Sequence, residues 1–412
     1  HSLKDMSSAH FFSDQAFAVV DRDDPRDLAI FNPAIEEKIS RGQTIIIGTC
    51  SPRREEMATA FLKKALPQLK DTLHIETRPI RGNVETRLRK LDDGEYDATI
   101  LATAGLNRLL RSAEDCSLIR SLLSNKRIML LPLIDCVPAP CQGAIGAEAN
   151  PANKRAVEVL NAINEPALFN TAFAEKRTGM QYGTGCLQQF GVTSIHTRQG
   201  HYIYAAGKDE TGTTFAAWDP LPSLSMDPAA VFSSTDHMRE FFTYEWRAAL
   251  PDIKEPVVFI ANYKLLDGVI NKTALKDKCI LVSGTKTWFE LARQGYWVSA
   301  GADALGFDFL LPSLSMPLLG ISAKNILILT HEAAAQRWQK KGLAAACTYR
   351  LTPVFNPTLF EQIANAKAIC WTSYAQFAAY GHHAKPGVTH ICAGGETATQ
   401  LIQAGIDPVI FP

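Results

Sequence analysis

Residues 44–54 form a segment, TIIIGTCSPRR, that combines a predicted strand, a turn and two adjacent arginines. Ser51 is typical of a helix N-cap and Pro52 of the first helical residue. Arg53 and Arg54 therefore fall in the first turn of the predicted helix. Cations are disfavoured there, because the amino end of a helix already carries partial positive charge. We predict that this turn binds anions, against the alternative that it is a solvated charged face.

A second segment, RPIRGNVETRL, repeats this arrangement about 30 residues later. Asn83 is suited to cap the next predicted helix, with Arg81 just before it and Arg87 one turn after it. Guanidinium groups bind both oxygens of a carboxylate. We therefore expect the two helix starts to converge on a ligand that carries carboxylates.

The elements that must position these residues alternate between strands and helices, which predicts an α/β layer with a mainly parallel sheet. After residue 188 the pattern changes to that of a small antiparallel sheet. Two further assignments are less regular: HMREFFTYEWRAAL is predicted to be a helix, and FDFLLPSLSMPLLGI to be strand and loop because of Pro312 and Pro317.

Composition excludes several classes of protein. Among the 412 residues, Lys+Arg and Asp+Glu both number 42, so the net charge of zero argues against a general binder of nucleic acid or membrane surfaces. No apolar run approaches the length of a membrane span. The nine cysteines show no zinc-ligand spacing, so we expect no metal, reduced thiols and a cytoplasmic location.

Six motifs, in chain order, resemble those of porphobilinogen deaminases, also called hydroxymethylbilane synthases. They are HSLKD, GTCSPRR, RGNVETRL, KLDDGEYDATILATAGLNRL, PAPCQGAIGAE and GTGC. The resemblance covers about residues 1–250. It implies a multidomain α/β protein with periplasmic-binding-protein-like domains and a small α+β domain that carries a covalent dipyrromethane cofactor.

The resemblance also implies roles for individual residues. Asp5 matches the catalytic carboxylate, with Lys4 beside it, and Cys186 matches the cysteine that holds dipyrromethane through a thioether. A lone Cys would otherwise be read as a buried structural residue, and a lone Asp as a solvated one. Cofactor carboxylates would be bound by Arg53, Arg54, Ser51, Thr49 and Lys4, and substrate by Arg81, Asn83 and Arg87.

The chain departs from the family pattern at several points. Cys50 replaces a usual Ser, Cys141 a usual Gly and Gln189 a usual Pro. If position 141 requires a positive φ, Cys141 adds strain of about 1 kcal/mol. The chain also begins at HSLKD, where deaminases have a preceding segment. We therefore expect a fragment of a longer protein that is inactive as a deaminase in this form.

The carboxy-terminal residues 256–412 resemble uroporphyrinogen-III synthases, a family of two α/β lobes. SGTKTWFELARQGYWV and AGGETATQLIQAGIDPVIF share a Gly–x–x–Thr helix start, although generic α/β packing is an alternative reading. The resemblance implies a cleft that binds propionates and a Tyr that acts as an acid. The matching loops hold Thr372, Ser373, Tyr374, Gly395, Glu396 and Thr397, and simple packing is the alternative role for Tyr374.

The predicted organisation is therefore a fusion of two enzymes. Residues 1–22 and 126–155 would form the remainder of deaminase domain 1, residues 23–125 domain 2, residues 156–251 the cofactor-attachment domain, and residues 256–412 the synthase-like region. The expected function is head-to-tail polymerisation of porphobilinogen with release of ammonia, followed by cyclisation of the linear tetrapyrrole, in a monomer. The alternatives are a deaminase with a structural tail and a non-catalytic anion-binding protein.

Overall fold

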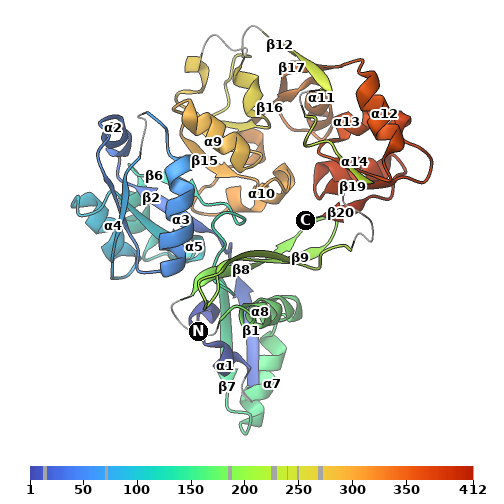
Figure 1. The fold of residues 1–412 in the computed structure, drawn as a ribbon. Coiled ribbons are helices and arrows are strands. Elements are labelled where there is room, and N and C mark those ends of the chain that lie inside the picture. Colours follow the sequence, from blue (N-terminus) through green and yellow to red (C-terminus); the bar gives the residue numbers. More distant parts are fainter. Residues whose placement is uncertain are drawn as a thin grey trace.

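The structure is a computed structural model that describes residues 1–12, 16–69, 73–183, 188–223, 230–238, 240–247, 250–267 and 272–411. Within these ranges the strands form five sheets, of two, three, four, five and six strands. Figure 1 shows the two-stranded sheet at the bottom of the molecule and the three-stranded sheet across its middle. The larger sheets and their helices lie above. The three-stranded sheet therefore lies between the two-stranded sheet and the larger sheets.

The amino-terminal residues pack on the two-stranded antiparallel sheet, which pairs β1 (Ala16–Arg22) with β7 (Ala144–Ala149). The helices of this part are η1 (Leu3–Asp5), α1 (Ser8–Phe11), α7 (Lys154–Ile163) and α8 (Pro166–Gly179). Leu3 is fully buried in the core of this part. That burial anchors η1 and hence the position of its last residue, Asp5.

The five-stranded sheet has the order β4-β3-β5-β2-β6. Its strands are β2 (Asp27–Phe31), β3 (Ile45–Gly48), β4 (Ile75–Arg78), β5 (Ala98–Ala102) and β6 (Arg127–Leu130). Its helices are α2 (Ile35–Ser40), α3 (Pro52–Ala65), α4 (Val84–Asp92), α5 (Thr103–Arg111) and α6 (Cys116–Leu123). The predicted parallel pairing is confirmed for β3 with β4 and β5, whereas β2 is antiparallel to both of its neighbours.

The predicted antiparallel sheet after residue 188 is confirmed. It consists of β8 (Gln189–His196), β9 (His201–Lys208) and β10 (Thr214–Asp219). Helix α8 contacts both β8 and β1. The helix therefore connects this sheet to the part of the molecule that holds Asp5.

The carboxy-terminal region contains two sheets. The six-stranded sheet has the order β12-β17-β16-β13-β14-β15 and consists of β12 (Phe242–Trp246), β13 (Val257–Ile260), β14 (Cys279–Val282), β15 (Val298–Gly301), β16 (Ile326–His331) and β17 (Ala345–Pro353). Its helices are η3 (Tyr263–Leu266), η4 (Lys272–Leu275), α9 (Thr285–Arg293), α10 (Phe307–Leu314), η5 (Ala323–Asn325) and α11 (Glu332–Lys340).

The second sheet of this region is parallel throughout. It consists of β11 (Val231–Ser233), β18 (Ala368–Trp371), β19 (Thr389–Ala393) and β20 (Val409–Phe411). Its helices are α12 (Pro357–Asn365), α13 (Tyr374–Tyr380), η6 (Gly381–His383) and α14 (Glu396–Gln403). Strands β11 and β12 precede residue 252 but pair with β18 and β17, so hydrogen bonding extends the carboxy-terminal sheets back to residue 231.

Two sequence assignments in this region are wrong. A helix is predicted around residues 237–250, but residues 242–246 form strand β12, because alternating Phe242, Tyr244 and Trp246 suit a strand that pairs with β17. The segment predicted to be strand and loop contains α10 despite Pro312. The proline removes one helical hydrogen bond, but burial of Leu310 and Leu314 on one face of the helix offsets that loss.

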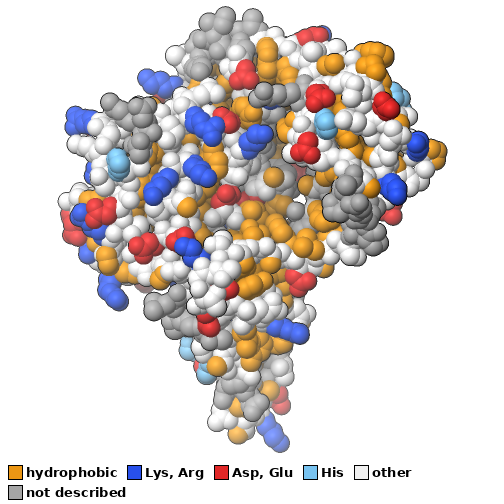
Figure 2. All heavy atoms as spheres, in the orientation of Figure 1, with side chains coloured by type: hydrophobic (Ala, Val, Ile, Leu, Met, Phe, Trp, Pro, Cys, Tyr) orange, Lys and Arg blue, Asp and Glu red, His pale blue; other side chains and the backbone are white. Residues whose placement is uncertain are grey.

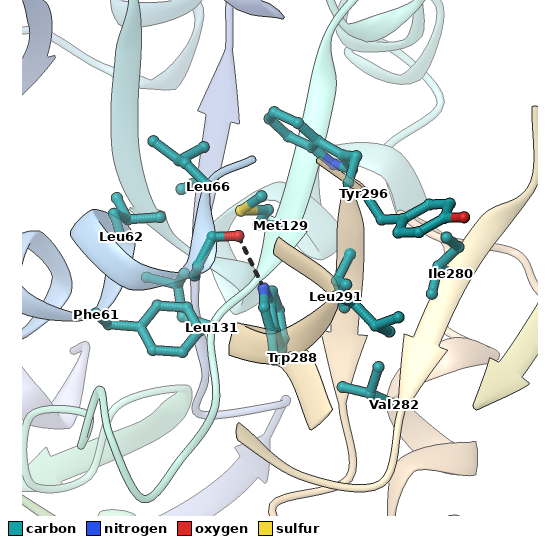
Figure 3. Packing of buried hydrophobic residues seen from close by; sticks show 14 of the residues in the cluster. Phe61, Leu62, Leu66, Met129, Leu131, Ile280, Val282, Trp288, Leu291 and Tyr296 are labelled. Carbon is teal, nitrogen blue, oxygen red and sulfur yellow. Dashed lines mark hydrogen bonds between the residues drawn. The ribbon is translucent and has the colours of Figure 1, made fainter. Parts of the chain in front are cut away.

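One hydrophobic core joins the amino-terminal five-stranded part to the carboxy-terminal region. Phe61 and Leu62 of α3 belong to the same buried cluster as Trp288 and Leu291 of α9 (Figure 3). The Trp288 Nε1 donates a hydrogen bond of 3.1 Å to the carbonyl of Ala65. The two halves therefore share a packed interior rather than meeting only at a linker.

Candidate active site

Asp5 lies at a cavity of about 360 Å³ that forms between four separate segments. The lining residues come from the chain start, the turn before α3, the loop before β7, and α8 with β8: Lys4, Asp5, Met6, Ser7, Ser8, Cys50, Ser51, Pro52, Arg53, Ala139, Pro140, Lys176, Gly179, Gln188 and Phe190. The Asp5 side chain is 67% exposed, and its Oδ1 lies 3.0 Å from the Lys4 Nζ. The carboxylate is therefore accessible to a ligand in the cavity.

A second cation at this cavity, Lys176, was missed by sequence reasoning. Its side chain is buried, and its Nζ donates a hydrogen bond to the Met6 carbonyl. Burial lowers the pKa of Lys176, while the charge of Asp5 is among those that oppose this change. The sequence did contain a signal, since Glu175 and Lys176 fall on the same helical face as the buried Ala172 and Gly179.

Cys186, the expected attachment site of the cofactor, lies outside the described residues. Its surroundings are described on both sides: Gly179 at the end of α8 and Gln188 just before β8 line the Asp5 cavity. The cavity also carries Lys4, Arg53 and hydroxyl groups, a donor set that suits a ligand with carboxylates. The residues present therefore fit dipyrromethane, whose side chains are carboxylates.

Arg53 and Arg54 lie at the start of α3 as predicted, but a buried carboxylate of the protein itself partly neutralises them. Ser51 caps α3 and Pro52 begins it. The Arg53 Nη2 lies 2.8 Å and the Arg54 Nη2 2.7 Å from the carboxylate of Asp27. Burial by itself raises the pKa of Asp27, but Arg53 and then Arg54 outweigh it and hold that pKa well below its usual range.

Arg53 and Arg54 share the single carboxylate of Asp27, so these three groups together carry one net positive charge. Arg53 also donates to the carbonyl of Val137, and Arg54 donates to the carbonyl of Ile100 at 3.3 Å. Thr49 is buried, and its Oγ1 accepts a hydrogen bond of 3.2 Å from the backbone amide of Ser51. Of the two arginines, Arg53 is the one that lines the Asp5 cavity.

The second arginine segment, at the start of α4, has no carboxylate bound to Arg81 or Arg87 in the described part of the chain. Asn83 caps α4 as predicted, accepting a hydrogen bond of 2.8 Å from the Thr86 amide. The Arg87 Nε donates to the carbonyl of Gly82 at 2.9 Å. Burial lowers the pKa of Arg87, and the charge of Arg54 lowers it further.

Position 141 has the positive φ that was anticipated, at 61°. The strained turn is held by Glu175, whose Oε2 accepts from the Cys141 amide at 2.7 Å. The Cys141 Sγ donates to the Ala172 carbonyl at 3.3 Å. Burial raises the pKa of the Cys141 thiol to about 12. A non-glycine residue in this conformation costs about 1 kcal/mol, which these contacts offset. Cys50, by contrast, is exposed and lines the Asp5 cavity.

A second cavity, of about 380 Å³, lies between the two carboxy-terminal sheets and the turn that joins β8 to β9. Gly395 and Glu396 line it, whereas Thr372, Ser373, Tyr374 and Thr397 do not. Figure 2 shows the surface hollowed between the part that holds α10 and the part that holds α14.

The loops around this second cavity are largely engaged in internal bonds. Gln199, from the β8–β9 turn, accepts from the Gly395 amide at 3.2 Å and donates to its carbonyl at 3.1 Å. Glu396 pairs with Lys341, whose Nζ lies at 3.3 Å. Ser373 and Gln376 form a reciprocal capping box at the start of α13, which places Tyr374 as its first residue.

Comparison with known families assigns the amino-terminal part. Residues 1–158 match the family model described as "Porphobilinogen deaminase, dipyromethane cofactor binding domain". Residues 1–158 are therefore similar to a porphobilinogen deaminase domain. The cofactor of this domain is dipyrromethane, and the matched range contains Asp5 and both arginine-bearing helix starts.

Curated porphobilinogen deaminases match beyond this domain. A probable porphobilinogen deaminase of Methanocaldococcus jannaschii is 34% identical over 203 residues, which is 49% of this chain and 61% of the relative. The deaminase of Nitrosomonas europaea is 35% identical over 192 residues, 46% of this chain and 54% of the relative. That of Laribacter hongkongensis is 33% identical over 217 residues, 52% and 62%. The chain thus spans about three fifths of the length of these deaminases.

A comparison of solved structures finds Thermus thermophilus uroporphyrinogen III synthase with 15% identity, covering 41% of this chain and 80% of that chain. The TM-score is 0.24, which is too low to establish a common fold.

In the described part of the chain, no helix is long and apolar enough to cross a membrane. Within the same residues, no three His, Cys, Asp or Glu side chains are grouped in a way that could hold a metal ion.

Proposed function

We propose that the protein is a hydroxymethylbilane synthase that joins porphobilinogen units head to tail and releases ammonia. The observation that carries the proposal is the accessible Asp5 carboxylate, placed in a cavity that Lys4, Arg53 and Lys176 make cationic. A protein that only binds anions needs the cations but has no use for a carboxylate among them. This combination favours an enzyme over the alternative of an anion-binding protein.

The reaction requires a carboxylate for a specific reason. Loss of ammonia from the aminomethyl group of porphobilinogen leaves an electron-poor azafulvene, whose pyrrole N–H carries positive charge. The Asp5 carboxylate stabilises that charge, and it accepts the proton that the attacked pyrrole carbon loses when the new carbon–carbon bond forms. The Lys4 ammonium lies 3.0 Å from this carboxylate, and Lys176 lines the same cavity.

The remaining residues bind and orient the chain of pyrroles. Dipyrromethane, when held through Cys186, supplies the pyrrole carbon to which the first substrate is joined. Arg53 and Ser51 face the acidic side chains from the cavity wall, with Thr49 fixing the Ser51 turn. Arg81, Asn83 and Arg87 form the open end, where the acetate and propionate of each added unit are neutralised.

Intact-mass spectrometry of the full-length protein tests this assignment. The wild-type protein should carry the mass of one dipyrromethane, and Cys186→Ser should lack it. Cys50→Ser is the matched control, since Cys50 is an exposed thiol at the Asp5 cavity and should keep the adduct. An active wild-type preparation without the added mass would overturn the proposal.

We further propose that residues 231–411 form a uroporphyrinogen-III synthase that closes the linear tetrapyrrole. Support comes from two α/β sheets that flank a cavity lined by Gly395 and Glu396 at the start of α14. The isomer ratio formed from porphobilinogen by the full-length protein alone is the test. Mainly type III product, reduced by Tyr374→Phe, would support a working synthase. Only type I product, which forms by spontaneous closure, would identify a structural tail.

A further inference from the structure

Two short segments carry the chain between the two-stranded sheet and the five-stranded sheet. The first, residues 23–26, leads from β1 into β2, and the second, residues 131–143, leads from β6 back to β7. We call these segments the two crossovers. Both lie against the carboxy-terminal region, at the loop after β15 and at α10.

Arg26, in the first crossover, is bound by the carboxy-terminal region. Its Nη2 lies 3.2 Å from Oδ2 of Asp303, and its Nη1 donates to Oγ of Ser313 at 2.7 Å. The Arg26 guanidinium also lies over the ring of Phe309, 5.3 Å from its centroid. Arg26 is 4% exposed, so its charge depends on these partners and on Asp24.

The same carboxylate reaches the second crossover. The backbone amide of Ile134 donates to Oδ1 of Asp303 at 3.3 Å, so one side chain holds both segments. Asp303 has a φ of 52°, a conformation that non-glycine residues seldom adopt. Strain of this kind persists where surrounding contacts fix the residue, and here the contacts are to the other half of the molecule.

These contacts are next to the groups that set the charge of the Asp5 cavity. Arg26 immediately precedes Asp27, the carboxylate that both Arg53 and Arg54 bind. Ile134 lies three residues before Val137, whose carbonyl accepts from Arg53. Displacement of either crossover would therefore move a partner of Arg53, the arginine that lines the cavity.

We propose that Asp303 and Ser313 are positioning residues for the deaminase site, supplied by the carboxy-terminal region. The carboxy-terminal region then acts as a rigid support for the deaminase part, whatever its own catalytic activity. We call the contacts of Asp303 and Ser313 with the two crossovers the clamp. The effect of the clamp on catalysis rests on the proposed deaminase function, but the contacts themselves do not.

Hydrogen exchange of the full-length protein measures the clamp without any assay of activity. In Asp303→Asn, the amides of Asp24, Arg26, Asp27 and residues 133–137 should exchange at least tenfold faster, while those of β3 and β5 stay unchanged. Ser313→Ala removes a single hydrogen-bonding side chain and should give a smaller increase, confined to residues 24–27. It also guards against the case in which Asp303→Asn fails to fold.

Trp288→Phe is the matched control, because it removes another hydrogen bond between the same two halves but touches α3 rather than the crossovers. It should leave the exchange of both crossovers unchanged. Equal exchange of the crossovers in wild type, Asp303→Asn and Ser313→Ala would overturn the proposal.

Kinetics then separate positioning from general destabilisation. Asp303→Asn should raise KM for porphobilinogen about tenfold and change kcat less than threefold, because Asp5 is held by η1 and not by the crossovers. Asp303→Glu should restore part of the KM. Faster exchange with an unchanged KM would support the contacts of Asp303 with the crossovers but would exclude an effect of those contacts on the deaminase site. Inactivity of the full-length wild-type protein would instead contradict the proposed function.

Discussion

Helices α3 and α4 start with the same plan, a capping residue followed within a turn by arginine, but their arginines have different surroundings. At α3, Arg53 and Arg54 are drawn inward to Asp27, which is 1% exposed. At α4, Arg81 and Arg87 have no carboxylate partner among the described residues. The difference is caused by Asp27 of β2, whose carboxylate binds both arginines of α3.

This difference gives the arginines of the two helix starts different roles. The α3 pair is partly neutralised, so it contributes one net charge and a fixed wall to the Asp5 cavity. The α4 pair keeps both charges available to an incoming carboxylate. A helix start with arginines is thus a structural ion pair or a binding site, depending on whether the fold supplies a buried acid.

The largest effect is expected from removal of that acid. Asp27→Asn leaves two buried guanidinium groups without their carboxylate, and breaking such a buried pair typically costs about 3–5 kcal/mol. The free energy of unfolding in urea measures it. Arg81→Gln, at the open helix start, is the control and should change that free energy by less than about 0.5 kcal/mol. Equal losses in both variants would remove the distinction between α3 and α4.

A half-buried carboxyl, that of Asp135, sharpens the comparison, because it lacks the arginines that Asp27 has. Burial, and next the charge of Asp303, raise the pKa of Asp135 to about 6. Its usual pKa is about 3.9. Below pH 4 the carboxyl is protonated in both folded and unfolded states and contributes nothing. Above pH 6 the folded state must ionise it, at a cost of up to about 3 kcal/mol.

Asp135→Asn should therefore stabilise the protein by about 1–3 kcal/mol at pH 8 and have little effect at pH 4. Unfolding curves at the two pH values test this. A variant that is less stable than wild type at pH 8 would show that the ionised carboxylate is well compensated.

A smaller change is expected at the open helix start. Arg87→Gln should leave the unfolding free energy within about 0.5 kcal/mol of wild type but raise KM for porphobilinogen at least tenfold, the usual worth of a charged hydrogen bond. Arg81→Gln, whose side chain is more exposed, should give a smaller increase. Steady-state kinetics at fixed ionic strength measure both. An unchanged KM in Arg87→Gln would argue that α4 does not bind substrate.

Local features of these sites could be predicted from the sequence. Ser51, Pro52 and Asn83 mark the starts of α3 and α4 because capping depends only on neighbouring residues. The possibility of a positive φ at Cys141 was raised by the Gly that the family usually has there, and φ is 61°. Non-local contacts could not be predicted in this way. Asp27 meets the arginines only because β2 runs antiparallel beside β5.

The same reason explains the errors in the carboxy-terminal region. Strand β12 pairs with β17, more than 100 residues later, and that pairing overrides a sequence that suits a helix. Helix α10 is stabilised by the sheet it covers, not by its own residues, which include Pro312. The clamp by Asp303 likewise joins residues separated by 277 positions.

The most direct test of the account is the turnover of Asp5→Asn in the full-length protein. The Asp5 side chain is 67% exposed, and its ion pair with Lys4 is at the surface, so the variant should unfold like wild type. Porphobilinogen consumption should nevertheless fall by about 10²–10⁴-fold, the usual worth of such a catalytic group. A rate within a few-fold of wild type would show that Asp5 is not the catalytic carboxylate.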